Sequence, residues 1–156
     1  MADHDIRLAV ARDAPGIAAM SRDFIEYGLG WRWTPERVLR CVRDPMINVA
    51  VAGRSGRLSG FGIMQYYENE AHLLLLAVQE SQRRKGVGSA LISWLEATAL
   101  TAGIGAIYLD ARAQNEAARA FYRKLGYQEV RVVRRFYRGR EDGVRIAKDL
   151  WAQQHA

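Results

Sequence analysis

The chain has 156 residues, of which 49% are hydrophobic and 26% charged. This length and composition suit a single globular domain, which we place over residues 1–156, rather than a fibrous or disordered protein. No apolar run reaches the length of about 18 residues that a membrane-spanning helix needs, which excludes a helical membrane protein.

Cysteine and histidine are rare in this sequence. Cys41 is the only cysteine, so an intramolecular disulfide is excluded. The three histidines, His4, His72 and His155, are far apart and do not have the spacing of metal ligands. We therefore expect no metal site.

The first five residues, Met1 to Asp5, contain two acids. A secretory signal peptide has basic residues there, followed by a long apolar core. We therefore expect a cytoplasmic protein with no membrane attachment.

The net charge of +6 is concentrated in one part of the chain. Residues 110–148 hold 11 basic and 5 acidic side chains, which accounts for the whole excess. An anionic partner is expected to bind this half, either a phosphorylated cofactor or an acidic protein surface. Nucleic acid is less expected because no recognition motif accompanies the charge, and a solvated basic face is an equal alternative.

The first half of the chain predicts a strand, two helices and a hairpin. Asp13 and Thr34 each precede an early proline, which is typical of helix starts. Two glycines in residues 53–57 indicate the turn of the hairpin. We expect strands over 6–11, 47–52 and 58–66, and helices over 13–25 and from 34 to about 44.

The second half predicts two parallel strands joined by a helix. Residues 72–78 are nearly all apolar, as expected of a central strand that is buried on both faces. Residues 89–102 have apolar side chains at helical spacing, and residues 107–112 alternate like a strand. A strand, helix and strand of this length form a right-handed crossover. A helix over 117–125 and an antiparallel pair over 128–137 and 144–150 should follow.

The segment Arg83-Arg84-Lys85-Gly86-Val87-Gly88-Ser89 joins the central strand to the crossover helix. Its glycines allow the backbone to approach a ligand, and free N–H groups at a helix start favour an anion such as a pyrophosphate. A tight turn with no ligand is the alternative. A dinucleotide-binding fingerprint and a P-loop are excluded, because their further glycine, acid or Gly-Lys-Ser/Thr residues are missing.

A second motif begins about 30 residues later. It consists of Asn115-Glu116-Ala117, followed by Phe121-Tyr122-Arg123-Lys124-Leu125-Gly126-Tyr127. Together with the Gly-x-Gly segment it resembles the GNAT superfamily of N-acetyltransferases, and the order of elements matches along essentially the whole chain. The resemblance implies an α/β fold with a mixed twisted sheet of about seven strands and helices on both faces. It also implies a central parallel strand pair that is splayed to admit coenzyme A.

Within this superfamily the chain is most similar to the bacterial ribosomal-protein alanine N-acetyltransferases. The similarity rests on residues 108–115, 134–137 and 139–142, and on Trp33. The chain differs from that branch at Asp110, where the branch usually has Glu as general base.

The resemblance implies a role for each matching residue. The backbone of Leu76, Ala77 and Val78 should bind the pantetheine arm, and the segment from Arg83 to Ser89 should bind the pyrophosphate. The remaining expectations are that Asn115 contacts coenzyme A, Tyr122 protonates the departing thiolate, Asp110 is the general base, and Trp33 and Tyr137 hold the acceptor.

Several of these residues also have a purely structural interpretation. Asn115 is a suitable N-cap, and Tyr122 and Trp33 are suitable core residues. Asp110 has Arg112 on the same strand face as a possible ion-pair partner, which would make it a poorer base. The alternatives for the base are Glu70 or Glu68 acting through water, whereas His72 is expected to be structural.

The expected function is acetyl transfer from acetyl-CoA to a primary amine, without a metal. A protein or peptide α-amine is the preferred acceptor, since its pKa of about 7.7 to 8.0 leaves more neutral amine at pH 7 than the pKa of about 10.4 of lysine. The first alternative is a small-molecule amine such as a polyamine, an amino sugar or an antibiotic. The second is a non-catalytic module that senses acetyl-CoA or docks on RNA.

Overall fold

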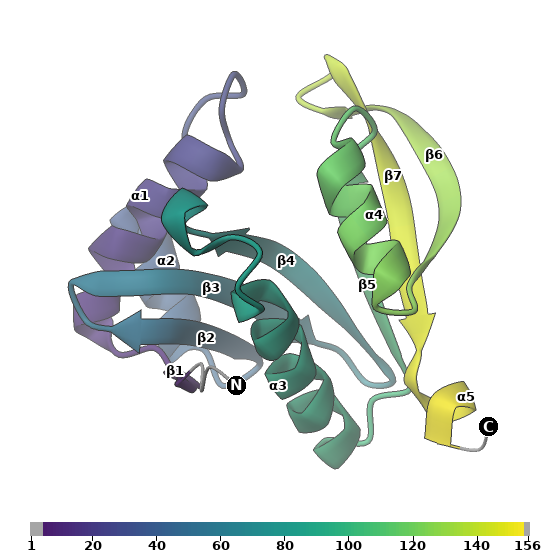
Figure 1. The fold of residues 1–156 in the computed structure, drawn as a ribbon, viewed down its shortest axis with the longest axis horizontal. Coiled ribbons are helices and arrows are strands. Elements are labelled where there is room, and N and C mark those ends of the chain that lie inside the picture. Colours follow the sequence, from purple (N-terminus) through teal and green to yellow (C-terminus); the bar gives the residue numbers. More distant parts are fainter. Residues whose placement is uncertain (1–4, 155–156) are drawn as a thin grey trace.

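The computed structural model describes residues 5–154, which form a seven-stranded sheet with helices against it (Figure 1). His4 and His155 of the sequence analysis lie outside these residues. The strands are β1 (Ile6–Leu8), β2 (Ile47–Arg54), β3 (Arg57–Tyr66), β4 (Glu70–Val78), β5 (Ala106–Arg112), β6 (Gln128–Tyr137) and β7 (Glu141–Asp149). The α-helices are α1 (Ala14–Phe24), α2 (Pro35–Arg43), α3 (Val87–Thr101), α4 (Glu116–Lys124) and α5 (Leu150–Gln154), and short 3-10 turns lie at Ala11–Asp13 and Glu80–Gln82.

The strand order is β1-β2-β3-β4-β5-β7-β6. Neighbouring strands are antiparallel except for β4 and β5, which are parallel and are joined through α3. The predicted mixed sheet with a central parallel pair is therefore confirmed.

Two hydrophobic cores cover the two faces of the sheet. On one face, Ile17 of α1 and Val38 of α2 pack with Phe61 of β3. On the other face, Leu91 and Leu95 of α3 pack with strand residues of the central sheet. The predicted helices on both faces are confirmed, and Figure 1 shows α3 on the opposite side of the sheet from α1 and α2.

Most element boundaries differ from the sequence prediction by one to three residues, and two of the differences have a clear local cause. β1 ends at Leu8, because the backbone N–H of Val10 donates to the Asp13 carboxylate and the chain turns there. The last strand ends at Asp149, whose carboxylate accepts the N–H of Trp151 and so starts α5.

None of the helices between residues 5 and 154 is long and apolar enough to cross a membrane.

The expectation that the central strand is buried on both faces is confirmed in part, since β4 contributes side chains to the core on each face. Burial alternates along β4, with buried residues at every second position and half-buried residues between them. The half-buried Leu74 and Leu76 pack at the edges of the two cores and also line a cavity. A continuous apolar run was therefore compatible with a strand that faces a cleft on one side.

A β-bulge interrupts β4 at Leu74. Ile63 of β3 pairs with Leu75, but the next residue, Met64, pairs with Leu73, so Leu74 has no partner in β3. Leu73 enters the core beneath α3, whereas Leu75 enters the core beneath α1 and α2. The bulge thus reverses which face of the sheet receives the buried side chains.

The pairing between β4 and β5 ends at the same place. It runs from Glu70 opposite Ala106 to Leu73 opposite Leu109 and does not continue. Beyond this point β4 and β5 diverge, as Figure 1 shows. The edge of β4 from Leu74 to Val78 therefore has no strand partner on the side of β5.

A buried carboxylate fixes the start of α1 to the sheet edge. Asp13 is 1% exposed and accepts hydrogen bonds from Arg7 Nη1 at 2.8 Å, the Val10 N–H at 2.8 Å and Ser55 Oγ at 2.8 Å. Burial by itself would raise the pKa of Asp13, but these hydrogen bonds outweigh it and lower the pKa to about 2.

We predict that Asp13→Asn lowers the free energy of unfolding by about 2 kcal/mol at pH 7, because a folded-state pKa near 2 lies well below the unfolded value of about 3.9. Since the folded-state pKa is depressed, this stabilisation is present above pH 4 and is lost as the pH falls towards 2. Urea unfolding of both proteins between pH 7 and pH 3 measures the difference. A difference that stays constant with pH would contradict the assignment.

Candidate active site

A large cleft opens where β4 and β5 separate. Its volume is about 1030 Å³, at the upper end of the range for ligand pockets. All the residues predicted to bind the cofactor line it except Lys85, whose side chain is not part of the lining. The lining residues from that prediction are Leu76, Ala77, Val78, Arg83, Arg84, Gly86, Val87, Gly88, Ser89 and Asn115.

The N-terminus of α3 forms one wall of the cleft. Gly86 is the N-cap residue, with φ of 84°, and so no side chain caps the first N–H groups of this 15-residue helix. Arg83 and Arg84 precede it and are exposed. Uncapped amides, the positive end of the helix dipole and two guanidinium groups make this wall suitable for an anionic group.

Gly88 has a packing role in addition to lining the cleft. A Cβ atom at Gly88 would lie 3.1 Å from the ring of Phe121 in α4. This is closer than most real Cβ contacts, so glycine at this position allows the aromatic ring to pack against the start of α3. The Gly-x-Gly segment therefore joins the two sequence motifs physically.

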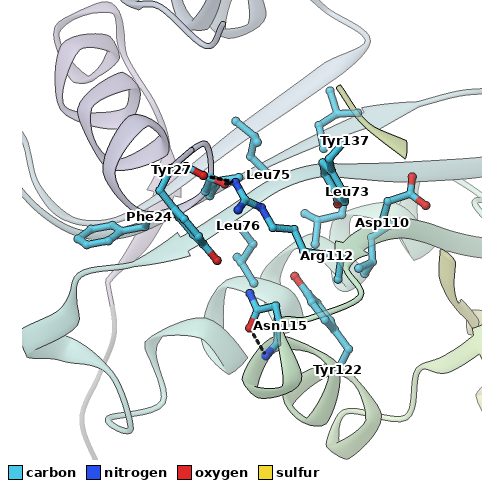
Figure 2. Close-up of a pocket in the computed structure, with 15 residues that line it drawn as sticks. Phe24, Tyr27, Leu73, Leu75, Leu76, Asp110, Arg112, Asn115, Tyr122 and Tyr137 are labelled. Carbon is cyan, nitrogen blue, oxygen red and sulfur yellow. Dashed lines mark hydrogen bonds between the residues drawn. The ribbon is translucent and has the colours of Figure 1, made fainter. Parts of the chain in front are cut away.

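A second, smaller cavity adjoins the first. Its volume is about 120 Å³, and Tyr122 lines both cavities together with Leu76 and Asn115 (Figure 2). The smaller cavity is also lined by Tyr27 from the α1–α2 loop and Tyr137 from the end of β6. Tyr122 thus stands where the two cavities meet.

The Tyr122 side chain is 7% exposed and packs against the rings of Phe121 and Tyr127. Its hydroxyl has no hydrogen-bond partner in residues 5–154. Every fully buried polar side-chain atom in these residues does have a partner, so the Tyr122 hydroxyl is not fully buried. The hydroxyl must therefore reach the open space of the cavities. Burial raises the pKa of Tyr122, and nearby Tyr137 raises it further, so the phenol stays protonated at neutral pH.

Asn115 caps a helix and also borders the cavities. Its side-chain oxygen accepts the N–H of Ala118 at 3.1 Å and so caps α4. The same side chain lines both cavities.

The expected alternative partner of Asp110 was wrong. Asp110 pairs with Arg145, its neighbour across β5 and β7, through two hydrogen bonds of 2.9 and 3.0 Å. This pair raises the pKa of Arg145. Figure 2 shows the Asp110 carboxylate turned away from the Tyr122 hydroxyl, although Asp110 lines the smaller cavity.

Arg112 instead holds the α1–α2 loop against β5. The side chain is 8% exposed, and its Nη2 donates to the carbonyl oxygens of Ile25 at 2.8 Å and Tyr27 at 2.6 Å. Its Nη1 donates to Glu141 at 3.3 Å, and the guanidinium lies 3.9 Å from the centre of the Tyr27 ring. One buried cation therefore fixes the wall of the smaller cavity.

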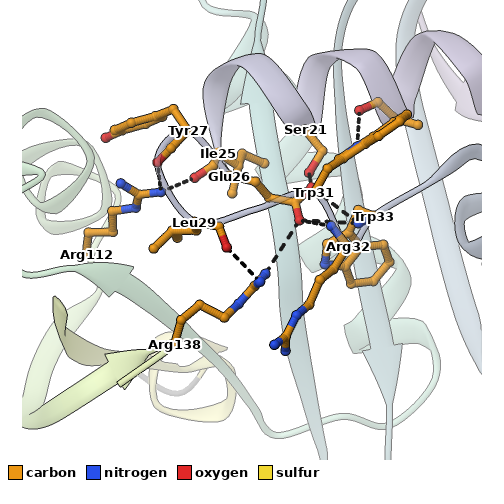
Figure 3. A network of polar contacts seen from close by, with 11 residues as sticks. Ser21, Ile25, Glu26, Tyr27, Leu29, Trp31, Arg32, Trp33, Arg112 and Arg138 are labelled. Atoms are coloured by element: carbon orange, nitrogen blue, oxygen red, sulfur yellow. Dashed lines mark hydrogen bonds and ion pairs between the residues drawn. The ribbon is translucent and has the colours of Figure 1, made fainter. Parts of the chain in front are cut away.

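A second buried charge organises the same loop internally (Figure 3). Glu26 is 6% exposed and accepts the N–H groups of Arg32 at 2.7 Å and Trp33 at 3.2 Å, and the Ser21 hydroxyl at 2.9 Å. From the β6–β7 turn, Arg138 donates to the Leu29 carbonyl at 2.8 Å and lies 3.7 Å from Glu26.

The sequence analysis did not single out Glu26 or Arg138. Glu26 is the only acid in an otherwise aromatic and glycine-rich stretch from Phe24 to Trp33, which was the available signal. Arg138 had no comparable signal, because its partners are more than 100 residues away in the chain.

The two residues expected to hold the acceptor differ in position. Tyr137 lines the smaller cavity, and burial followed by the nearby Asp110 raises its pKa. Trp33 lines neither described cavity. Its ring lies 3.8 Å from the Arg37 guanidinium and packs at the edge of the core beneath α1 and α2.

The other candidate bases also lie outside both cavities. His72 Nε2 donates to the Glu70 carboxylate at 2.7 Å, and Glu68 is exposed in the loop before β4. Between residues 5 and 154 no three His, Cys, Asp or Glu side chains are grouped so that they could hold a metal ion.

Residues 17–127 match the acetyltransferase (GNAT) family. The chain belongs to this family. It is 35% identical over 97 residues to the ribosomal protein bS18-alanine N-acetyltransferase of Escherichia coli (strain K12), and the match covers 60% of this chain and 66%, just under two thirds, of that one. It is 32% identical over 112 residues to the N-alpha-acetyltransferase RimI of Mycobacterium tuberculosis, with 68% of each chain covered.

The structure agrees with this assignment. The crystal structure of the ribosomal-protein-S18-alanine N-acetyltransferase from Escherichia coli superposes with a TM-score of 0.78 and 25% identity, over 95% of this chain and 94% of that one. The resemblance seen in the sequence motifs is therefore confirmed for the family and the fold.

We predict that Arg112→Met lowers the free energy of unfolding by about 2 kcal/mol, because removing the buried cation takes away the hydrogen bonds to the carbonyl groups of Ile25 and Tyr27 and the ion pair with Glu141. Amide hydrogen exchange should become faster in residues 25–33, and urea unfolding measures the stability. Arg131→Met, on an exposed position of β6, is the control. Equal exchange in this loop for both variants would contradict its dependence on Arg112.

Proposed function

We propose that this GNAT protein transfers the acetyl group of acetyl-CoA to a protein or peptide α-amine. The observation that carries the proposal is the position of the Tyr122 hydroxyl, at the junction of a long cleft and a small cavity. A donor bound in the cleft and an amine in the small cavity would meet at this hydroxyl.

The cleft has the features that coenzyme A requires. The start of α3 and the nearby Arg83 and Arg84 would bind the pyrophosphate. The edge of β4 from Leu74 to Val78, which β5 leaves unpaired, offers backbone groups to the amides of the pantetheine arm. This arrangement supports acetyl-CoA as the donor.

The proposed chemistry is direct transfer. The amine nitrogen forms a bond to the thioester carbonyl carbon, and an N–H group on the free edge of β4 stabilises the charge on the carbonyl oxygen. The C–S bond then breaks, and Tyr122 gives its proton to the departing sulfur. Its raised pKa keeps this proton available at neutral pH.

The proton of the amine needs an acceptor, for which Asp110 remains our candidate. Both of its oxygens accept hydrogen bonds from Arg145, and its carboxylate turns away from Tyr122. We therefore favour transfer to Asp110 through water over direct contact. An α-amine suits such an arrangement, since about a tenth of it is already neutral at pH 7.

The small cavity also supports a compact acceptor group. A volume of about 120 Å³ is small beside the roughly 300 to 1,000 Å³ of most ligand pockets. An N-terminal amine with a small side chain fits this space. The names of the two curated relatives, both acetyltransferases for alanine or N-alpha amines, favour the same acceptor class.

The test uses the purified protein, acetyl-CoA and peptides that carry both a free N-terminus and an internal lysine. We expect coenzyme A to raise the melting temperature, since a ligand at 100 times its dissociation constant adds about 2.7 kcal/mol. Mass spectrometry should place the acetyl group on the N-terminus. Modification confined to lysine, or a preference for spermidine or an aminoglycoside over every peptide, would refute the acceptor assignment. An unmoved melting curve at millimolar coenzyme A would refute the donor.

Tyr122→Phe should reduce turnover by about 10²-fold while the affinity for coenzyme A changes only a few-fold, because only the proton donor is lost. Thiol release measures turnover, and calorimetry measures binding. Tyr66→Phe is the matched control, since the Tyr66 hydroxyl bonds to Asn48 and Thr98 and lines neither cavity. Equal turnover of the two variants would remove Tyr122 from the mechanism.

A further inference from the structure

We infer that the acceptor chain carries carboxylates in the residues that follow its N-terminus, and that Arg32 and Arg140 recognise them. This inference rests on the proposed function, because it concerns the same acceptor site. It specifies the acceptor by the positive charge of two loops, residues 25–34 and 138–140, which we call the rim of the smaller cavity.

Two loops form this rim and touch each other. The α1–α2 loop supplies Tyr27 to the cavity wall, and the end of β6 supplies Tyr137. Arg138 connects the loops through the Leu29 carbonyl, and its guanidinium lies 3.7 Å from the place where a Cβ atom of Gly30 would be. Arg32 follows Gly30 by two residues, and Arg140 follows Arg138 by two residues.

Every carboxylate of the rim is already bound within the protein. Glu26 is buried among backbone N–H groups, and Glu141 pairs with Arg112. Asp110 pairs with Arg145, and Asp142 accepts the backbone N–H of Arg135.

Several cations of the rim have no such partner. Within residues 5–154, no carboxylate forms an ion pair with the exposed Arg32 and Arg140 of these two loops, or with the exposed Arg134 and Arg135 of the neighbouring β6. Figure 3 shows Arg138 reaching into the α1–α2 loop, where it meets the Leu29 carbonyl, and the Arg32 side chain extending from that loop. The rim therefore carries an excess of positive charge on both sides.

An extended chain advances by about 3.3 Å per residue, so the residues just after an N-terminus in the small cavity must pass this rim. Carboxylates at these positions meet uncompensated guanidinium groups, whereas lysines or arginines meet like charge. Exposed charge pairs are weak individually and are screened by salt. The preference should therefore be moderate and should fall as the ionic strength rises.

The test compares three peptides that differ only at positions 2 to 4, which are Glu, Gln or Lys. At low salt, kcat/KM for N-terminal acetylation should be about 10-fold higher for the Glu peptide than for the Gln peptide, and lowest for the Lys peptide. The Glu to Gln ratio should approach one in 0.5 M salt. Equal values at low salt, or a preference for Lys, would overturn the inference.

The double variant Arg32→Gln/Arg140→Gln should reduce the Glu to Gln ratio to about one. Arg54→Gln/Arg57→Gln, two exposed arginines of the β2–β3 hairpin outside both cavities, should keep the wild-type ratio. Equal loss in both double variants, or no loss in either, would refute recognition by the rim.

Binding measurements separate this inference from the proposed function. Calorimetry of the same peptides with the protein and coenzyme A should give the same order of affinities even if no acetyl group is transferred. A correct order of affinities without acetylation would refute the function alone. Acetylation without charge preference would refute the rim alone. A short RNA that binds the rim more tightly than the Glu peptide, and loses affinity in the Arg32→Gln/Arg140→Gln variant, would also overturn the inference.

Discussion

The end of the β4–β5 ladder is the constraint on which the site depends. A parallel pair in the middle of a sheet would normally satisfy its backbone groups along its whole length. Here the pairing stops after Leu73 and Leu109, because the bulge at Leu74 bends β4 away. β5 stays paired with β7 over all seven of its residues, so the sheet opens on one side only. The cleft is the space that this opening leaves.

Opening a sheet at its centre removes the packing that would otherwise hold its two halves together. Polar contacts take over this task beside the smaller cavity. Arg112 binds two carbonyl groups of the α1–α2 loop, and Arg138 binds a third from the opposite strand pair. Glu26 balances this positive charge inside the loop. Hydrogen bonds to buried charges are strong and directional, so a loop without helix or strand structure has a defined position.

The two proposed proton-transfer residues have opposite surroundings. Tyr122 is buried among aromatic rings, with its hydroxyl open to both cavities, so its environment keeps it neutral and available as a donor. Asp110 accepts two hydrogen bonds from Arg145, so an ion pair fixes the orientation of its carboxylate. Asp110 and Arg145 occupy directly opposed positions on the neighbouring strands β5 and β7. A side chain as short as Asp therefore reaches the guanidinium group of Arg145.

The sequence by itself determined most of the elements, the family and a set of residues that lines the large cleft. These follow from local patterns: Asp13 and Thr34 before early prolines, the apolar period of α3, and the two motifs around Gly86 and Tyr122. The tertiary structure alone decided which charges meet. Asp110 and Arg112 share a strand face, yet the partner of Asp110 comes from β7 and that of Arg112 from a loop some 85 residues earlier. Local periodicity places a side chain on a face, but the partner of a charge depends on strand register and loop path, which arise from packing distant segments.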